Sequence, residues 1–230
     1  MHRISFLVVL WFLGALLVSG QLPGETSKRL RSGAGAETAY DEFGDPQSAK
    51  CLVLLHGASG PVPFYRDQAR FFGDEGFRVL MPHYFDSTRG QSPSPENYRK
   101  WASVTADFVA ECRKQASTKA VFLIGFSLGS SVALAAGSQN VSVNAIADWY
   151  GSLPDEFFYQ MKGMPPLLIL HGERDSNIPI MNAQQLVKLC EMKHLDCEHH
   201  FYADQEHGFQ GAALEDARQR TLTFFAEHAK

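Results

Sequence analysis

The chain has 230 residues, of which 45% are apolar and 20% are charged, and its net charge is −4, from 21 basic and 25 acidic side chains. This length fits one large domain or two small ones, and the composition is that of a globular protein. The weak negative charge gives no reason to expect nucleic acid as a partner, and a single long apolar run excludes a fibre, a coiled coil and a protein with several membrane spans.

The apolar run lies at the N-terminus. Arg3 supplies positive charge, Ile4 to Val18 is almost entirely apolar, and Val18-Ser19-Gly20 offers small or apolar residues to a signal peptidase. We predict that residues 1–20 are a secretory signal peptide cleaved after Gly20, because a core of about 15 residues is short for a membrane span of about 20. The mature protein is then secreted or periplasmic and has no stable membrane span. An uncleaved anchor helix is the alternative.

The elements expected after this segment alternate between strands and helices. Residues 21–36 have no apolar period and are predicted to be a flexible leader before a domain that spans residues 37–230. The predicted strands are residues 51–55, 77–81, 120–124, 145–147, 167–170 and 198–202, with 36–43 as a candidate edge strand. The predicted helices are residues 64–75, 96–116, 127–139, 180–192 and 212–229.

This alternation is typical of βαβ units, which build a mostly parallel sheet. The strands are continuously apolar, which indicates that both faces of the sheet are covered. We therefore predict a single-domain α/β fold, doubly wound, with helices on both faces. Ligands bind such sheets at the carboxyl ends of the strands, so the functional residues are expected in the loops that follow them.

One of these loops contains a G-x-S-x-G motif, Gly125-Phe126-Ser127-Leu128-Gly129. An apolar strand leads into it and a helix of small residues leaves it, which is the setting of a nucleophile elbow. Side chains at the two glycine positions would clash with the neighbouring strand and helix. The motif predicts Ser127 as a nucleophile raised above the sheet, and a tight turn with a serine helix cap is the alternative.

A serine hydroxyl needs a base to take its proton, and the base is a histidine held by a carboxylate. His207 follows the last predicted strand and Asp175 follows the strand before it. The chain order Ser127, Asp175, His207 is the order that a catalytic triad has in this kind of sheet. Asp148 is the alternative acid. His56, His83 and His171 also lie at strand ends, but His56 and His171 precede glycine directly, which favours turn packing.

Two backbone N–H groups should stabilise the negative charge that develops on a carbonyl oxygen under attack. We expect one from Leu128, at the start of a helix, and the other from Ala58 in the loop His56-Gly57-Ala58-Ser59-Gly60. Aromatic residues in the loops predict an apolar substrate pocket. We name Tyr84, Phe85 and Tyr150 as candidate substrate-binding residues.

These residues resemble those of the α/β-hydrolase superfamily and, within it, the dienelactone hydrolase family. The resemblance covers about residues 50 to 228 and includes the elbow, the segment Leu170 to Pro179 and Glu206-His207-Gly208-Phe209. That family has a cysteine nucleophile, a glutamate in the oxyanion loop and arginines that grip the substrate carboxylate. Here the elbow carries Ser127, Gly57 stands at the glutamate position, and the fourth position after His207 is Gly211. The resemblance therefore implies a serine mechanism and does not predict dienelactone itself as the substrate.

We predict a serine hydrolase that cleaves a small carboxylic ester, thioester or lactone through an acyl-enzyme intermediate, without a cofactor or metal. A catalytically silent secreted binding module and a small exopeptidase-like acyl hydrolase are the alternatives. The protein should be a monomer or homodimer. A cluster from His194 to His200 lacks the spacing of a known metal motif.

Export would place the four cysteines, Cys51, Cys112, Cys190 and Cys197, in an oxidising compartment, where three pairings are possible. Cys190 and Cys197 are close in sequence, at a predicted helix end and a predicted strand start. We favour that pair, and four buried free thiols are the alternative.

Overall fold

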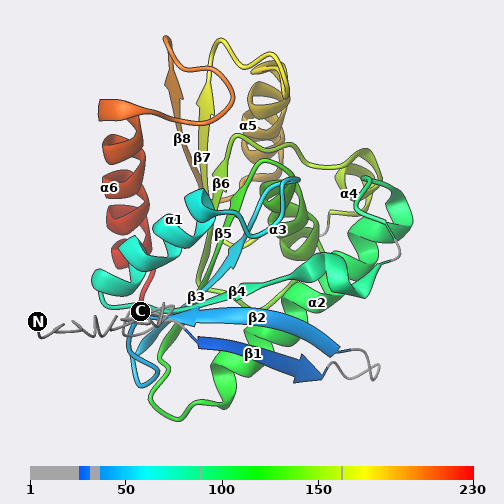
Figure 1. The fold of residues 1–230 in the computed structure, drawn as a ribbon. Helices are drawn as coiled ribbons and strands as arrows, with labels where there is room; N and C mark the ends of the chain where they lie inside the picture. The colour runs from blue at the N-terminus through cyan, green and yellow to red at the C-terminus, as the bar shows by residue number, and fades with distance from the viewer. Residues whose placement is uncertain (1–25, 32–36, 89, 162) are drawn as a thin grey trace, which may run out of the picture.

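The structure is a computed structural model that describes residues 26–31, 37–88, 90–161 and 163–230 (Figure 1). The predicted signal peptide, residues 1–20, lies outside these residues. Among the residues that the structure does describe, no helix is long and apolar enough to cross a membrane.

A single mixed sheet forms the centre of the described chain, with the strand order β1-β2-β4-β3-β5-β6-β7-β8. The strands β3 to β8 pair in parallel, whereas β1 with β2 and β2 with β4 pair antiparallel. This confirms the predicted mostly parallel sheet. The strand bounds are β1 Thr26–Arg31, β2 Glu37–Phe43, β3 Lys50–Leu55, β4 Arg78–Pro82, β5 Ala120–Phe126, β6 Ala145–Trp149, β7 Leu167–Gly172 and β8 Cys197–Tyr202.

Helices cover both faces of this sheet, as Figure 1 shows. Side chains of α1 and α6 pack in one buried apolar cluster, and those of α2, α3 and α5 pack in the other. Successive residues of the central strands alternate between the two clusters, as Leu52 and Val53 do. The helix bounds are α1 Pro63–Asp74, α2 Pro95–Lys114, α3 Leu128–Ser138, α4 Asp155–Gln160, α5 Met181–Lys193 and α6 Gly211–Glu227, with a short 3₁₀ helix, η1, at Tyr84–Ser87.

The N-terminal edge of the sheet differs from the prediction. Residues 26–31, which we assigned to a flexible leader, form β1 and pair with β2, so β2 is one strand in from the edge. Lys28 of β1 forms an ion pair with Glu42 of β2. An edge strand can be held by backbone pairing with one neighbour and can keep a polar sequence, so it shows no apolar period. The short helix α4 was not predicted either.

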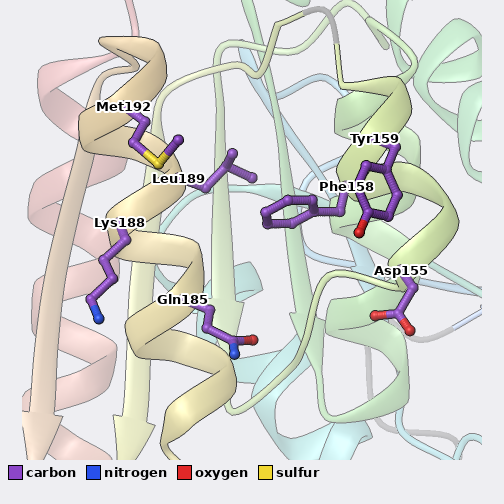
Figure 2. Close-up of a pocket in the computed structure, with 7 residues that line it drawn as sticks. All are labelled: Asp155, Phe158, Tyr159, Gln185, Lys188, Leu189 and Met192. Atoms are coloured by element: carbon purple, nitrogen blue, oxygen red, sulfur yellow. The ribbon is translucent and has the colours of Figure 1, made fainter.

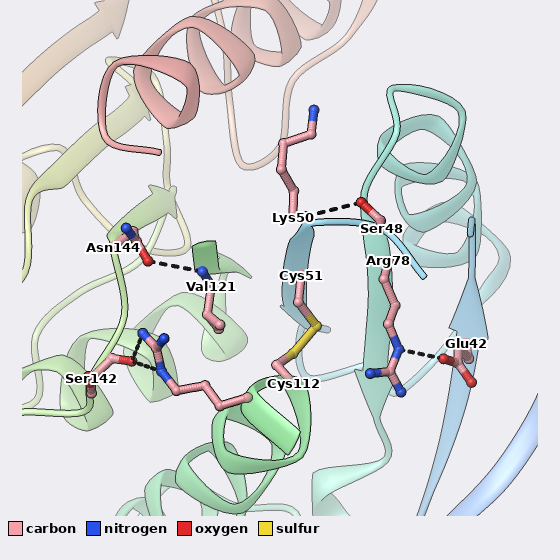
Figure 3. Close-up of a disulfide and its surroundings, with 10 residues drawn as sticks. Glu42, Ser48, Lys50, Cys51, Arg78, Cys112, Val121, Ser142 and Asn144 are labelled. Atoms are coloured by element: carbon pink, nitrogen blue, oxygen red, sulfur yellow. Dashed lines mark hydrogen bonds and ion pairs between the residues drawn. A yellow bond between two sulfur atoms is a disulfide. The ribbon is translucent and has the colours of Figure 1, made fainter. Parts of the chain in front are cut away.

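Two disulfides join elements that lie against each other in this fold, and no cysteine of the described residues is free. Cys190 of α5 is bonded to Cys197 of β8, which confirms the favoured pair. The second bond joins Cys51 of β3 to Cys112 of α2, as Figure 3 shows, with 5.8 Å between their Cα atoms. It therefore ties a central strand to the helix that covers it.

Removing the Cys51–Cys112 bond should destabilise the protein more than removing the Cys190–Cys197 bond. A cross-link restricts the unfolded chain more when it closes a longer loop, and the sequence separations are 61 and 7 residues. The chain-entropy relation gives losses of about 4 and about 2 kcal/mol in the free energy of unfolding. Urea denaturation of the two double cysteine-to-alanine variants measures both losses, and equal losses would contradict the prediction.

Candidate active site

Ser127 lies in the turn between β5 and α3, in a backbone conformation that few residues adopt. Its φ is 55° and its ψ is −120°. A Cβ on Gly125 would lie 2.3 Å from the Cα of Ser130, and one on Gly129 would lie 2.1 Å from the carbonyl oxygen of Leu55. Only glycine fits at either position, so the clash argument made from the sequence is confirmed. The turn presents the serine side chain at the carboxyl edge of the sheet.

The structure brings Ser127, His207 and Asp175 into one chain of hydrogen bonds. His207, in the loop after β8, places its Nε2 2.8 Å from the Oγ of Ser127 and its Nδ1 2.8 Å from the Oδ2 of Asp175. A carboxylate only accepts hydrogen bonds, so Nδ1 carries the proton and Nε2 is left to accept from the serine hydroxyl. This tautomer is the one in which the imidazole can take a proton from serine.

Backbone N–H groups of the loop after β7, which contains Asp175, hold its carboxylate in place. Its Oδ1 accepts the backbone N–H groups of Asn177 at 2.9 Å and Ile178 at 2.8 Å, so its Oδ2 remains directed to His207. His171 adds to this arrangement, because its Nε2 donates to the carbonyl oxygen of Ile178 at 2.8 Å and lies 3.3 Å from Asp175 Oδ2. His171 therefore packs the turn, as its place before Gly172 indicates.

The alternative acid, Asp148, lies elsewhere. It is fully buried on β6, and its Oδ1 accepts the hydroxyl of Ser130 and the backbone N–H of Gly151, the latter at 2.9 Å. Burial raises the pKa of this carboxyl. Asp148 thus bonds to the first turn of α3 and the end of β6, whereas Asp175 contacts His207. Another rival, His83, is paired with Asp41 at 2.9 Å.

The two backbone N–H groups expected for an oxyanion hole belong to neighbouring segments. Leu128 is the first residue of α3, and Ala58 lies in the exposed loop after β3. The close approach of Gly129 to the carbonyl oxygens of Leu55 and His56 places the start of α3 directly against the start of that loop. Gly129, one of the two glycines of the elbow, therefore also sets the spacing of the two segments.

His56 orients the peptide group that ends in the Ala58 N–H. Its Nδ1 donates to the carbonyl oxygen of Gly57 at 2.9 Å, and the N–H of Gly60 donates to the same oxygen at 3.1 Å. A trans peptide holds its C=O and N–H in opposite directions, so fixing the Gly57 carbonyl also fixes the Ala58 N–H. From the sequence His56 was interpreted as turn packing, and its position before Gly57 was the only signal for this role.

Tyr84 supports His56 from within the core. Its ring stacks on the His56 ring, with 4.4 Å between the centroids and 16° between the planes, and its hydroxyl donates to the His56 carbonyl oxygen at 2.7 Å. It is fully buried. Its assignment as a substrate-binding residue is therefore corrected: an aromatic residue in a loop after a strand can point into the core, and the sequence pattern does not show this direction.

Burial of His56 should make the protein acid-sensitive. Desolvation lowers the pKa of His56 to about 4, while its bond to Gly57 opposes this shift. The ordinary histidine pKa is about 6.5, so between these values the unfolded chain binds more protons than the folded one. The free energy of unfolding should therefore decrease as the pH falls from about 6.5 to about 4, with His56 contributing about 3 kcal/mol to the decrease.

The variant His56→Asn tests this contribution, because asparagine keeps an N–H donor near the Gly57 carbonyl and does not titrate. Urea denaturation at neutral and acidic pH should give a smaller pH dependence for the variant than for the wild type. The same substitution at an exposed histidine, His199→Asn, serves as the control. Identical pH dependence in the wild type and His56→Asn would contradict the prediction.

A cavity of about 340 Å³ opens beside His207. Its lining residues come from the loop after β3, from α1, and from the segments that follow β6 and β8. They are Ser59, Val62, Phe64, Tyr65, Tyr150, His207, Gly208, Phe209 and Gln210. Tyr150 lines this cavity, whereas Phe85 packs against the rings of His56 and Trp101 and is not among the lining residues.

A second cavity, of about 450 Å³, lies between α4 and α5, and its described lining residues belong to these two helices, as Figure 2 shows. The exposed ring of Phe158 points across it toward Leu189, and the exposed Tyr159 lies on the α4 side. None of the triad candidates lines it. In the part of the chain that the structure describes, no group of His, Cys, Asp and Glu side chains is arranged to hold a metal ion.

The parallel sheet, the elbow and the order of the polar loops define the class of α/β hydrolases. The family model of the dienelactone hydrolase family matches residues 42–229, so the chain belongs to the dienelactone hydrolase family. A protein of Escherichia coli K12 named "Putative carboxymethylenebutenolidase" is 24% identical over 212 residues, which cover 77% of this chain and 76% of that protein. One of the same name from Yersinia pestis is 26% identical over 133 residues, and this alignment spans half the length of each.

Solved structures of related proteins have the same fold. A dienelactone hydrolase-like promiscuous phosphotriesterase from metagenomic libraries superposes with a TM-score of 0.74 at 14% identity, covering 89% of this chain and 99% of the other. An esterase of Pyrococcus furiosus superposes with a TM-score of 0.73 at 16% identity, covering 90% and 92%. At these identities the likeness concerns the fold alone.

Proposed function

We propose that the protein is a serine hydrolase that cleaves small, uncharged carboxylic esters, thioesters or lactones through an acyl-enzyme intermediate. The observation that carries this proposal is the pair of 2.8 Å contacts that connect Ser127 through His207 to Asp175. Membership in the dienelactone hydrolase family supports it, as does the presence of an esterase among proteins of the same fold.

In the proposed mechanism Ser127 Oγ attacks the substrate carbonyl carbon while His207 Nε2 takes its proton. Asp175 keeps the imidazole in the required tautomer and stabilises the imidazolium. The N–H groups of Leu128 and Ala58 stabilise the negative charge on the carbonyl oxygen. His207 then gives the proton to the leaving group, and a water molecule, activated by the same imidazole, releases the acid from Ser127.

The lining of the cavity beside His207 supports an uncharged substrate. It contains phenylalanine, valine and tyrosine, and none of the described residues that line it is lysine, arginine, aspartate or glutamate. A substrate carboxylate would lose its hydration there without gaining a cationic partner, which is unfavourable. We therefore do not extend to this chain the substrate that the name carboxymethylenebutenolidase indicates for its relatives.

Acylation of Ser127 by a fluorophosphonate probe tests this proposal. The probe should label the native protein at a single peptide that contains Ser127, and the labelled protein should no longer hydrolyse p-nitrophenyl butyrate. Heat-denatured protein is the control, because labelling should depend on the folded site. A native protein that stays unlabelled and inactive would instead be a binding module on a hydrolase scaffold.

We also infer that the protein is exported, with residues 1–20 as its signal peptide. Both disulfides support this proposal, since such bonds persist in oxidising compartments. N-terminal sequencing of the protein purified from its host tests it, and the expected first residue is Gln21.

A further inference from the structure

The cavity beside His207 contains two tyrosine hydroxyl groups that form no hydrogen bond with any residue that the structure describes. Tyr65 is 8% exposed and Tyr150 is 3% exposed. Neither hydroxyl oxygen is among the fully buried atoms that lack a partner, so both are accessible within the cavity, where a ligand that replaces water can complete their bonding.

Tyr65 places its hydroxyl beside the oxyanion loop. A Cβ on Gly57 would lie 2.2 Å from this hydroxyl oxygen and 3.3 Å from the carbonyl oxygen of Phe126, which precedes Ser127. The Tyr65 ring is held by Phe64 and Phe126, at centroid distances of 5.2 and 5.6 Å. The ring packing therefore holds the hydroxyl against Gly57 of the oxyanion loop.

Tyr150 is held equally firmly at the end of β6. Its φ is 48°, a conformation that costs energy for a tyrosine and persists only where the surroundings enforce it. Its N–H donates to the carbonyl oxygen of Leu170 at 2.8 Å, and its ring packs against the rings of His207 and Phe209 at 5.1 and 5.0 Å. Burial and the nearby Tyr65 hydroxyl raise the pKa of Tyr150, so it remains an uncharged O–H group.

The cavity lies on the side of the site where the leaving group departs. In the proposed mechanism His207 gives its proton to the leaving oxygen, so the alcohol part of an ester lies against the imidazole. The cavity that His207 lines is therefore available to that alcohol. Since the described residues that line it include no acidic or basic side chain other than the imidazole, the alcohol should be uncharged.

We propose that Tyr65 and Tyr150 form a polar subsite that selects esters of uncharged alcohols carrying a second oxygen atom, such as glycol ethers, over esters of plain alkyl alcohols. This inference rests on the proposed function. An ether or hydroxyl oxygen in the alcohol accepts a hydrogen bond from a tyrosine. A plain alkyl chain in the same place displaces water from both hydroxyls and leaves them unpaired.

The test compares 2-methoxyethyl butyrate with n-butyl butyrate, which share the acyl group and have alcohols of nearly equal size. The ratio of their kcat/KM values is measured for the wild type, Tyr65→Phe, Tyr150→Phe and the double variant. The difference in intrinsic reactivity between the two esters does not depend on the enzyme variant, so it cancels when the ratios of two variants are compared. Tyr159→Phe, at an exposed position on α4, is the matched control.

The ratio of kcat/KM for the methoxyethyl ester to kcat/KM for the butyl ester should fall by about 3- to 10-fold in at least one single variant, because this is the effect of losing one net hydrogen bond. In the double variant this ratio should fall at least as far. Tyr159→Phe should leave the ratio unchanged. Hydrolysis of both esters with an unchanged ratio in all tyrosine variants would overturn the subsite and leave the proposed function intact. A wild type that hydrolyses neither ester, and that the fluorophosphonate probe does not label, would overturn both.

Discussion

The variant Ser127→Ala is expected to lower kcat/KM for p-nitrophenyl butyrate by roughly 10⁴- to 10⁶-fold, because it removes the atom that would form the acyl-enzyme. The turn should survive the change. Gly125 and Gly129, which set the close contacts of the elbow, are still present, and alanine is smaller than serine. Steady-state kinetics, together with a denaturation curve that shows native stability, measures the effect.

Ser138→Ala, at the far end of the helix that Ser127 precedes, provides the control, because the structure shows the Ser138 hydroxyl donating to the carbonyl oxygen of Ala135. Its activity should equal that of the wild type. A second variant, Ser127→Gly, should be as inactive as Ser127→Ala but more stable by about 1 kcal/mol, since glycine adopts a φ of 55° without strain. Wild-type turnover in Ser127→Ala would contradict the proposed mechanism.

Asp175→Asn is expected to lower kcat/KM by roughly 10³- to 10⁴-fold while leaving the fold in place. The N–H groups of Asn177 and Ile178 will still require an acceptor, so the amide oxygen should take the position of Oδ1. The amide NH₂ then faces His207 Nδ1 and donates to it. His207 consequently carries its proton on Nε2, where it can no longer accept the proton of Ser127.

The matched control is Asp148→Asn, which replaces the other buried carboxylate at a strand end. Its Oδ1 contacts are with Ser130 and Gly151, so the change should leave the tautomer of His207 unaffected and reduce kcat/KM by less than about tenfold. Comparable losses of kcat/KM in the two variants would contradict the assignment of Asp175 as the acid. The comparison therefore separates the two candidates that the sequence left open.

The local pattern was sufficient to predict the main features of the fold. The strands β3 to β7 consist mostly of apolar residues, because burial on both faces leaves few polar positions to interrupt them, whereas the edge strand β8 is largely polar and only partly buried. The elbow could also be predicted from its sequence. Gly125 and Gly129 have no room for a Cβ next to neighbouring backbone atoms, so these two positions require glycine. The loops that carry Asp175 and His207 follow parallel strands, so their meeting at one edge of the sheet was predictable.

The direction of a side chain in a loop was not predictable in the same way. Tyr84 and Tyr150 both follow strands and both carry aromatic rings, yet Tyr84 stacks on His56 in the core and Tyr150 lines the cavity beside His207. The difference arises from the turn that follows each strand and from the neighbours available to each ring. Likewise β1 depends on a partner strand, which no pattern within its own residues reveals.

The sequence by itself determined the class of fold, the position of the candidate nucleophile and the order of its two candidate partners, because each is specified by short-range backbone requirements and by apolar runs. Only the tertiary structure decided that Asp175 rather than Asp148 contacts His207, that His56 orients the Gly57–Ala58 peptide, and that two tyrosine hydroxyls share a cavity. These depend on contacts between residues far apart in the chain, whose geometry is set by packing.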